Sequence, residues 1–73
     1  MIVEIWGKDN CGFCTAAKSL AESKQLTYTY KKLGVDFTRE EVFDAFPEAR
    51  TFPQIKVNNT PIGGYNEFVK LVG

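Results

Sequence analysis

Two cysteines separated by two residues, Cys11 and Cys14, are the side chains with the clearest chemical potential. They are the only cysteines in the 73 residues, and the chain has no histidine. A mononuclear zinc site needs four ligands, so this pair would have to borrow ligands from a second chain. A disulfide across so short a loop stabilises little, because the effect grows with loop length. Redox catalysis is the third interpretation, and the local context favours it.

The context is a predicted helix that begins at the pair. Cys11 lies at the helix N-terminus, where unpaired amides and the helix dipole favour an anion. Lys8 adds a positive charge three residues earlier. Both effects lower the pKa of a thiol, and the thiolate is the nucleophile. We therefore expect Cys11 to attack, and Cys14, one turn inside on the apolar face, to be the buried resolving thiol.

The periodicity of apolar residues predicts seven elements in the order βαβαββα. Strands are expected at Ile2–Trp6, Thr27–Lys31, Gln54–Val57 and Thr60–Ile62, and helices from Phe13 to about Lys24, from Thr38 to near Pro47, and after Gly63–Gly64. The first strand, helix and strand imply a parallel right-handed crossover, and Asn58–Asn59 suggests a hairpin. The expected fold is a single α/β domain over residues 1–73, with a four-stranded mixed sheet and helices on both faces.

Local signals also predict which residues face the core. Thr38 and Glu41 have the spacing of a capping box, which begins the second helix. The residues expected to point inward are Cys14, Ala17, Leu20 and Ala21 in the first helix, Val42, Phe43 and Phe46 in the second, and Phe68, Leu71 and Val72 in the third.

The composition narrows the classes of partner. Nine basic residues balance nine acidic ones, so nothing indicates binding to nucleic acid or to a membrane surface. The first strand is too short, and too soon interrupted by charge, for a signal peptide or a membrane span. We expect a cytoplasmic monomer.

Three blocks, taken together, resemble glutaredoxins, the glutathione-linked branch of the thioredoxin-like fold. They are Lys8–Cys14 (KDNCGFC), Thr51–Ile55 (TFPQI) and Gly63–Glu67 (GGYNE). The resemblance covers essentially the whole chain. It implies a glutathione-dependent thiol–disulfide oxidoreductase that reduces protein disulfides and glutathione mixed disulfides. Ribonucleotide reductase is a frequent client in the family.

The resemblance also implies a binding site for glutathione, the co-substrate. Phe52 would offer its backbone to the glutathione cysteine, beside a cis Pro53 that faces Cys11. Gly64 and the helix that follows would take the γ-glutamyl end, and Lys8 would pair with the glycine carboxylate. The implied glutathione-binding residues are Lys8, Phe13, Thr51, Phe52, Pro53, Gly64, Tyr65 and Asn66.

Two features leave alternatives open. Gly12–Phe13 between the cysteines is similar to the monothiol members that carry iron–sulfur clusters, although those have serine where this chain has Cys14. No resident metal is expected, and a [2Fe–2S] cluster would require a dimer that uses Cys11 and glutathione. The other alternative is a glutaredoxin-like redoxin served by thioredoxin reductase, which needs no glutathione groove.

Overall fold

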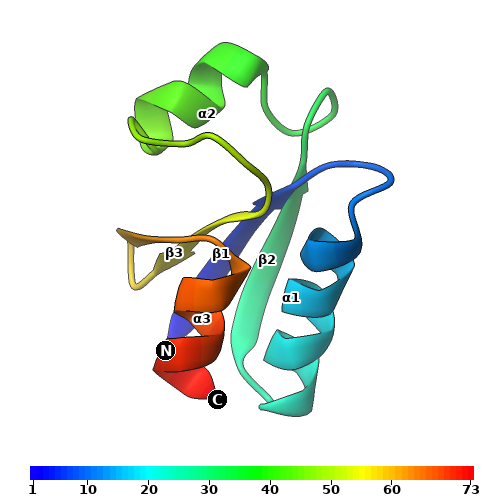
Figure 1. The fold of residues 1–73 in the computed structure, drawn as a ribbon, viewed down its shortest axis with the longest axis vertical. Coiled ribbons are helices and arrows are strands. Elements are labelled where there is room, and N and C mark those ends of the chain that lie inside the picture. The colour runs from blue at the N-terminus through cyan, green and yellow to red at the C-terminus, as the bar shows by residue number, and fades with distance from the viewer.

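The predicted order of strands and helices is confirmed by the computed structural model, which describes all 73 residues (Figure 1). The elements are β1 (Ile2–Gly7), α1 (Gly12–Ser23), β2 (Thr27–Lys32), α2 (Arg39–Ala45), β3 (Gln54–Val57), β4 (Thr60–Gly63) and α3 (Tyr65–Val72). The sheet order is β2-β1-β3-β4, with β1 parallel to β2 and the other pairs antiparallel. The mixed four-stranded sheet is therefore as predicted.

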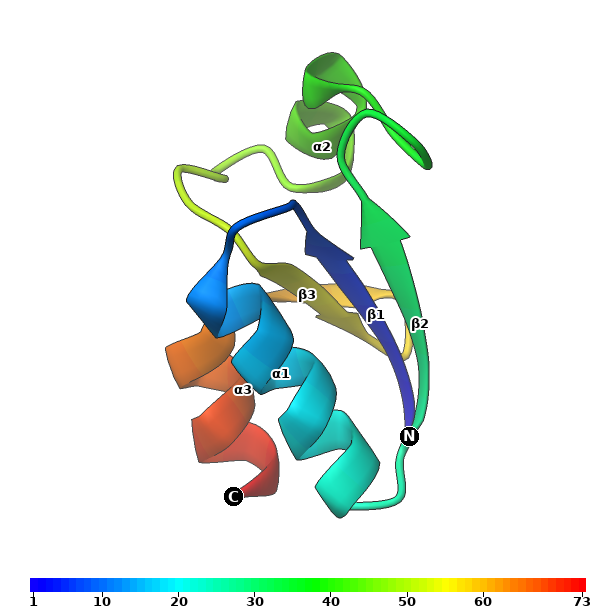
Figure 2. The same ribbon diagram turned by 90° about the vertical axis from the view of Figure 1, so that its right-hand side faces the viewer.

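The main core lies between the sheet and two helices. Figure 2 shows α1 and α3 side by side on one face of the sheet. Alternate residues of the central strands point to this face, as the pleat requires. The buried members of this core are Val3, Ile5, Ala17, Ala21, Ile55, Val57 and Phe68.

A second, smaller core attaches α2 to the opposite side of β1. Trp6 follows the inward-facing Ile5, so its side chain projects from the other face. Its ring lies 4.6 Å from that of Phe37 and 5.4 Å from that of Phe46, measured between centroids, and Val42 of α2 completes the cluster. The sheet thus has helices on both sides, with α2 lying toward the end where β1 and β2 finish (Figures 1 and 2).

Two predicted core residues are exposed. Phe43 is 48% exposed and Leu71 is 50% exposed, so the prediction that they point inward is wrong. In α2, Val42 and Phe46 already fill the contact with Trp6, and Phe43 lies about 100° around the helix from Val42. In α3, Phe68 and Val72 form the inward stripe, which leaves Leu71 at its margin.

The beginning of α2 is held by the predicted capping box. The Thr38 hydroxyl accepts a hydrogen bond from the Glu41 amide at 3.2 Å, and the Glu41 carboxylate accepts one from the Thr38 amide at 2.9 Å. Two amides without helical partners are thereby satisfied. The hairpin prediction also holds, because Asn58 and Asn59 both have positive φ, as a two-residue type I′ turn requires.

Removing this cap is expected to weaken the attachment of α2. Thr38→Ala should lower the free energy of unfolding by about 1 kcal/mol, since the Glu41 amide loses its acceptor. Urea denaturation followed by circular dichroism measures the change. Thr38→Ser keeps the hydroxyl and is the matched control, so an equal loss in both variants would contradict the capping role.

None of the three helices has the length and apolar run that crossing a membrane requires.

Candidate active site: the cysteine pair and its groove

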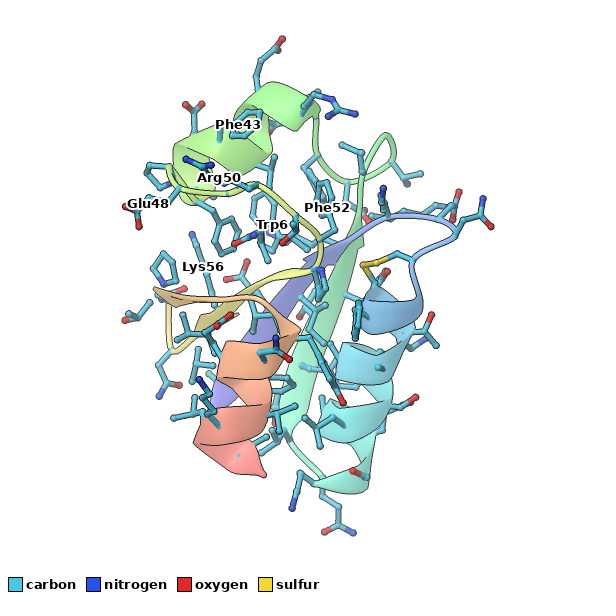
Figure 3. All side chains as sticks on the ribbon, in the orientation of Figure 1. Trp6, Phe43, Glu48, Arg50, Phe52 and Lys56 are labelled. Carbon is cyan, nitrogen blue, oxygen red and sulfur yellow. A yellow bond between two sulfur atoms is a disulfide. The ribbon has the colours of Figure 1, made fainter.

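The cysteine pair lies at the junction between β1 and α1. Gly7 ends the strand, residues 8–11 turn the chain, and α1 begins at Gly12. Cys11 and Cys14 form a disulfide, visible as the yellow bond above α1 in Figure 3. Cys14 is fully buried and Cys11 is partly exposed. Only Cys11 can therefore meet an incoming disulfide, as the order of the two thiols in the sequence predicts.

Cys11 is the N-cap of α1, and its sulfur occupies the position of a capping oxygen. The Cys14 amide donates to Cys11 Sγ at 3.2 Å. No acidic residue lies in the first turn of α1 to oppose a negative charge there. When the disulfide opens, the same amide and the helix dipole favour the Cys11 thiolate over the thiol. The geometry thus supplies one of the two predicted causes of a low pKa.

Lys8 is the second predicted cause. Its Nζ lies 5.8 Å from the centroid of the ring of Phe52, the residue whose carbonyl oxygen is near Cys11 Sγ. Its effect on the Cys11 thiol stays a prediction.

Gly7 allows tight packing beneath the pair. A Cβ at this position would overlap the Tyr30 hydroxyl and would lie 3.1 Å from Cβ of Cys14. Burial raises the pKa of Tyr30 above its ordinary value, and the carboxylate of Asp9 raises it further. Gly7 leaves the Tyr30 phenol room beside Cys14.

The segment Thr51–Pro53 faces Cys11 from the other side. The Phe52 carbonyl oxygen is 3.9 Å from Cys11 Sγ, and the Phe52–Pro53 peptide bond is cis, as the resemblance implies. Buried Gln54 supports this segment, because its side-chain amide donates to the Thr51 carbonyl at 2.7 Å. Sequence reasoning missed this role of Gln54. No signal in the sequence indicated it, because the strand alternates polar and apolar residues and Gln54 falls in the polar set with Lys56.

A groove of about 950 Å³ begins beside the pair and runs between the Thr51–Pro53 segment and the start of α3. It brings together most of the residues that the sequence assigned to glutathione. Those lining it are Phe13, Thr51, Phe52, Pro53, Gly64, Tyr65 and Asn66. Lys8, Cys11 and Cys14 do not line it, although Cys11 borders it through the carbonyl of Phe52.

Two contacts define the far wall of the groove. The Phe13 and Tyr65 rings lie 5.6 Å apart between centroids, so they bridge α1 and α3 above the core. A Cβ on Gly64 would lie 3.3 Å from the Pro53 carbonyl oxygen, closer than most side chains approach. Glycine at this position lets the backbone of α3 approach the cis-proline segment.

Glu67 was not predicted as a site residue, and it changes the expected anion site at α3. Its carboxylate accepts a hydrogen bond from the Gly64 amide at 2.8 Å. A ligand carboxylate would therefore meet the remaining amides of the first turn, which have no helical partner. Gly64 has no hydroxyl, so the usual capping-box pattern that signals such a glutamate is absent from the sequence.

The sequence model of the glutaredoxin family matches residues 3–62. This chain belongs to the glutaredoxin family. The glutaredoxin of Haemophilus influenzae is 32% identical over an alignment of 79 positions, which covers 99% of this chain and 91% of that protein. Glutaredoxin 1 of Escherichia coli is 33% identical over an alignment of 75 positions, which covers 93% of this chain and 88% of that protein.

The fold comparison agrees with the sequence comparison. The NMR structure of oxidised Escherichia coli glutaredoxin superposes with a TM-score of 0.85 at 30% identity, covering 99% of this chain and 93% of that one. The thioredoxin-like fold is therefore confirmed, and the chain is a thiol–disulfide oxidoreductase whose redox pair is Cys11 and Cys14.

Proposed function

We propose that this glutaredoxin draws its electrons from glutathione and reduces both protein disulfides and glutathione mixed disulfides. The observation that supports this most is the position of Cys11. Its sulfur is capped by the Cys14 amide at 3.2 Å and lies 3.9 Å from the Phe52 carbonyl, at the border of a groove. A tripeptide thiol lying in that groove would bring its own sulfur to Cys11.

The proposed reaction begins with thiolate attack. Cys11 attacks one sulfur of a client disulfide, which forms a mixed disulfide and releases the other client sulfur as a thiolate. Cys14 then attacks Cys11 Sγ, which releases the second client thiol and closes the Cys11–Cys14 disulfide. Two electrons have passed from the cysteine pair to the client.

Glutathione then restores the reduced pair. One glutathione thiolate attacks Cys11 Sγ, forms an adduct and frees Cys14. A second glutathione thiolate attacks the sulfur of the bound glutathione, which yields glutathione disulfide and the Cys11 thiolate.

Each part of glutathione is assigned to the residues that the resemblance to glutaredoxins implied. The Phe52 backbone would hold the cysteine of glutathione, and Thr51 and Pro53 would shape that part of the groove. Phe13 and Tyr65 would cover it, while Gly64 and the first turn of α3 with Asn66 would receive the γ-glutamyl end. Lys8 would pair with the glycine carboxylate.

We propose a single-domain cytoplasmic monomer whose clients are disulfide-containing proteins, with ribonucleotide reductase as one candidate client.

The test is the source of electrons. A small glutathione mixed disulfide is supplied, and NADPH consumption is followed with glutathione plus glutathione reductase and, separately, with thioredoxin reductase. Turnover only in the glutathione system is expected. Turnover only with thioredoxin reductase would contradict the glutathione assignment and favour the redoxin alternative. Failure in both systems would also contradict it, and a coloured dimer on purification with glutathione would then favour the cluster carrier.

Cys14→Ser is expected to separate the two reactions. Reduction of a glutathione mixed disulfide should stay within a few-fold of wild type, while reduction of an intramolecular protein disulfide should fall about tenfold or more, because no thiol remains to resolve the client adduct. Insulin reduction and the mixed-disulfide assay measure the two rates. Ser19→Ala, an exposed change on the same helix, is the control. Equal loss of both activities would contradict the assigned roles.

A further inference from the structure

Phe43 is an exposed aromatic residue with cationic neighbours. It lies in a small hollow of about 50 Å³ between α2 and the segment that leads to Phe52. The hollow is lined by Arg39, Val42, Phe43, Ala49, Arg50, Thr51 and Phe52. Two arginines line it and no acidic residue does.

The two arginines are electrostatically unpaired. The ion pairs of the molecule join Lys31 to Glu4 and Lys32 to Asp9, so neither Arg39 nor Arg50 takes part in one. Both side chains are exposed. Acidic residues are nearby in the chain, namely Glu40, Asp44 and Glu48, but none of them lines the hollow. The hollow therefore combines an apolar floor with two arginines that form no ion pair.

The hollow is continuous with the active site. Phe52 lines it, and the carbonyl of the same residue lies 3.9 Å from Cys11 Sγ. In Figure 3, Phe52 lies between Phe43 of α2 and the disulfide. Arg50, Thr51 and Phe52 line both the hollow and the glutathione groove, whereas Arg39 and Phe43 line the hollow alone, so its α2 side lies outside the proposed glutathione site.

We propose that this hollow is a docking point for client polypeptides, which receives an apolar side chain against Phe43 and an adjacent carboxylate on Arg39 and Arg50. The inference rests on the proposed reduction of protein disulfides. A client that carries an acidic and an apolar residue near its disulfide would be held by the hollow while its sulfur lies at Cys11. Buried aromatic and arginine contacts are the kind that dominate protein interfaces.

The test compares peptides that differ only beside the disulfide. Each peptide holds one intramolecular disulfide, flanked on both sides by leucine and two aspartates, by leucine and two lysines, or by serine and two aspartates. Wild-type protein is expected to reduce the leucine–aspartate peptide with a kcat/KM about tenfold above that of the lysine peptide, and several-fold above that of the serine peptide.

Two variants and two matched controls test which residues cause the preference for the leucine–aspartate peptide. Arg39→Glu reverses one charge at the first position of α2, where glutamate favours the helix dipole and the helix should stay folded. Phe43→Ser removes the aromatic floor. Lys24→Glu and Leu71→Ser make the same kinds of change at exposed positions at the opposite end of the molecule. We expect the first two variants to lose most of the preference and the controls to keep it.

Turnover of the small glutathione mixed disulfide separates this inference from the proposed function. It should stay within about twofold of wild type in all four variants, because none of these residues lines the glutathione groove. Equal rates for the three peptides in wild type would overturn the docking point. A preference that survives in Arg39→Glu and Phe43→Ser would overturn it as well, even with glutathione activity intact.

Discussion

Cys11→Ser is expected to lower reduction of glutathione mixed disulfides by about a thousandfold or more, because serine offers no thiolate at neutral pH. Cys11 is the only redox sulfur that solvent reaches, since Cys14 is fully buried. No other side chain can therefore replace it as the attacking group. NADPH consumption in the glutathione reductase system measures the rate.

Inactivity through unfolding must be distinguished from loss of the nucleophile itself. Serine is a good N-cap, so its hydroxyl can accept the Cys14 amide hydrogen bond and α1 should persist. Cys14→Ser removes the same disulfide but keeps the nucleophile. If both variants unfold at the same temperature and only Cys11→Ser is inactive, the loss of activity is due to removal of the nucleophile. A Cys11→Ser protein within tenfold of wild type would refute the mechanism.

The largest effect on stability is expected from Phe68→Ala. Phe68 is fully buried in the main core, where it joins α3 to α1 and the sheet. Truncating a buried phenylalanine costs about 3–5 kcal/mol through lost burial and the remaining cavity. A domain of this length has a free energy of unfolding of only about 4–11 kcal/mol, so the substitution is expected to remove a large fraction of its stability. Urea denaturation measures the change as a lower midpoint.

Leu71→Ala is the matched control for this prediction. It removes an aliphatic side chain from the same helix, but at a half-exposed position, and is expected to cost about 1 kcal/mol or less. Phe68→Leu leaves a smaller cavity, at about 1–2 kcal/mol, and covers the case in which the alanine variant does not fold. Equal costs at positions 68 and 71 would show that α3 is not anchored by Phe68.

The position of α3 also bears on the proposed binding of glutathione. Gly64, Tyr65 and Asn66 line the groove from the first turn of this helix. A helix released from the core would no longer hold these residues opposite the Thr51–Pro53 segment. We therefore expect the KM for glutathione to rise in Phe68→Ala at temperatures where the protein is still mostly folded.

Most of the secondary structure could be predicted because its signals are local. The capping box of Thr38 and Glu41, the Asn58–Asn59 turn and the glycine at the end of β1 each act within a few residues, and the structure contains all three. The inward direction of Phe43 and Leu71 could not be predicted in the same way. A helix with more apolar residues than its contact can cover leaves some exposed, and the packing partner decides which.

The order of the elements, the placement of Cys11 at a helix N-terminus and the burial of Cys14 can all be read from the amino-acid sequence, because chain spacing and local backbone hydrogen bonds are sufficient for these. The shape of the groove, the support of Thr51 by Gln54, the capping of Gly64 by Glu67 and the unpaired arginines beside Phe43 emerge only in the folded molecule. These features depend on how segments far apart in the chain approach one another. Such distances arise from the packing of the whole core, which no local pattern of residues encodes.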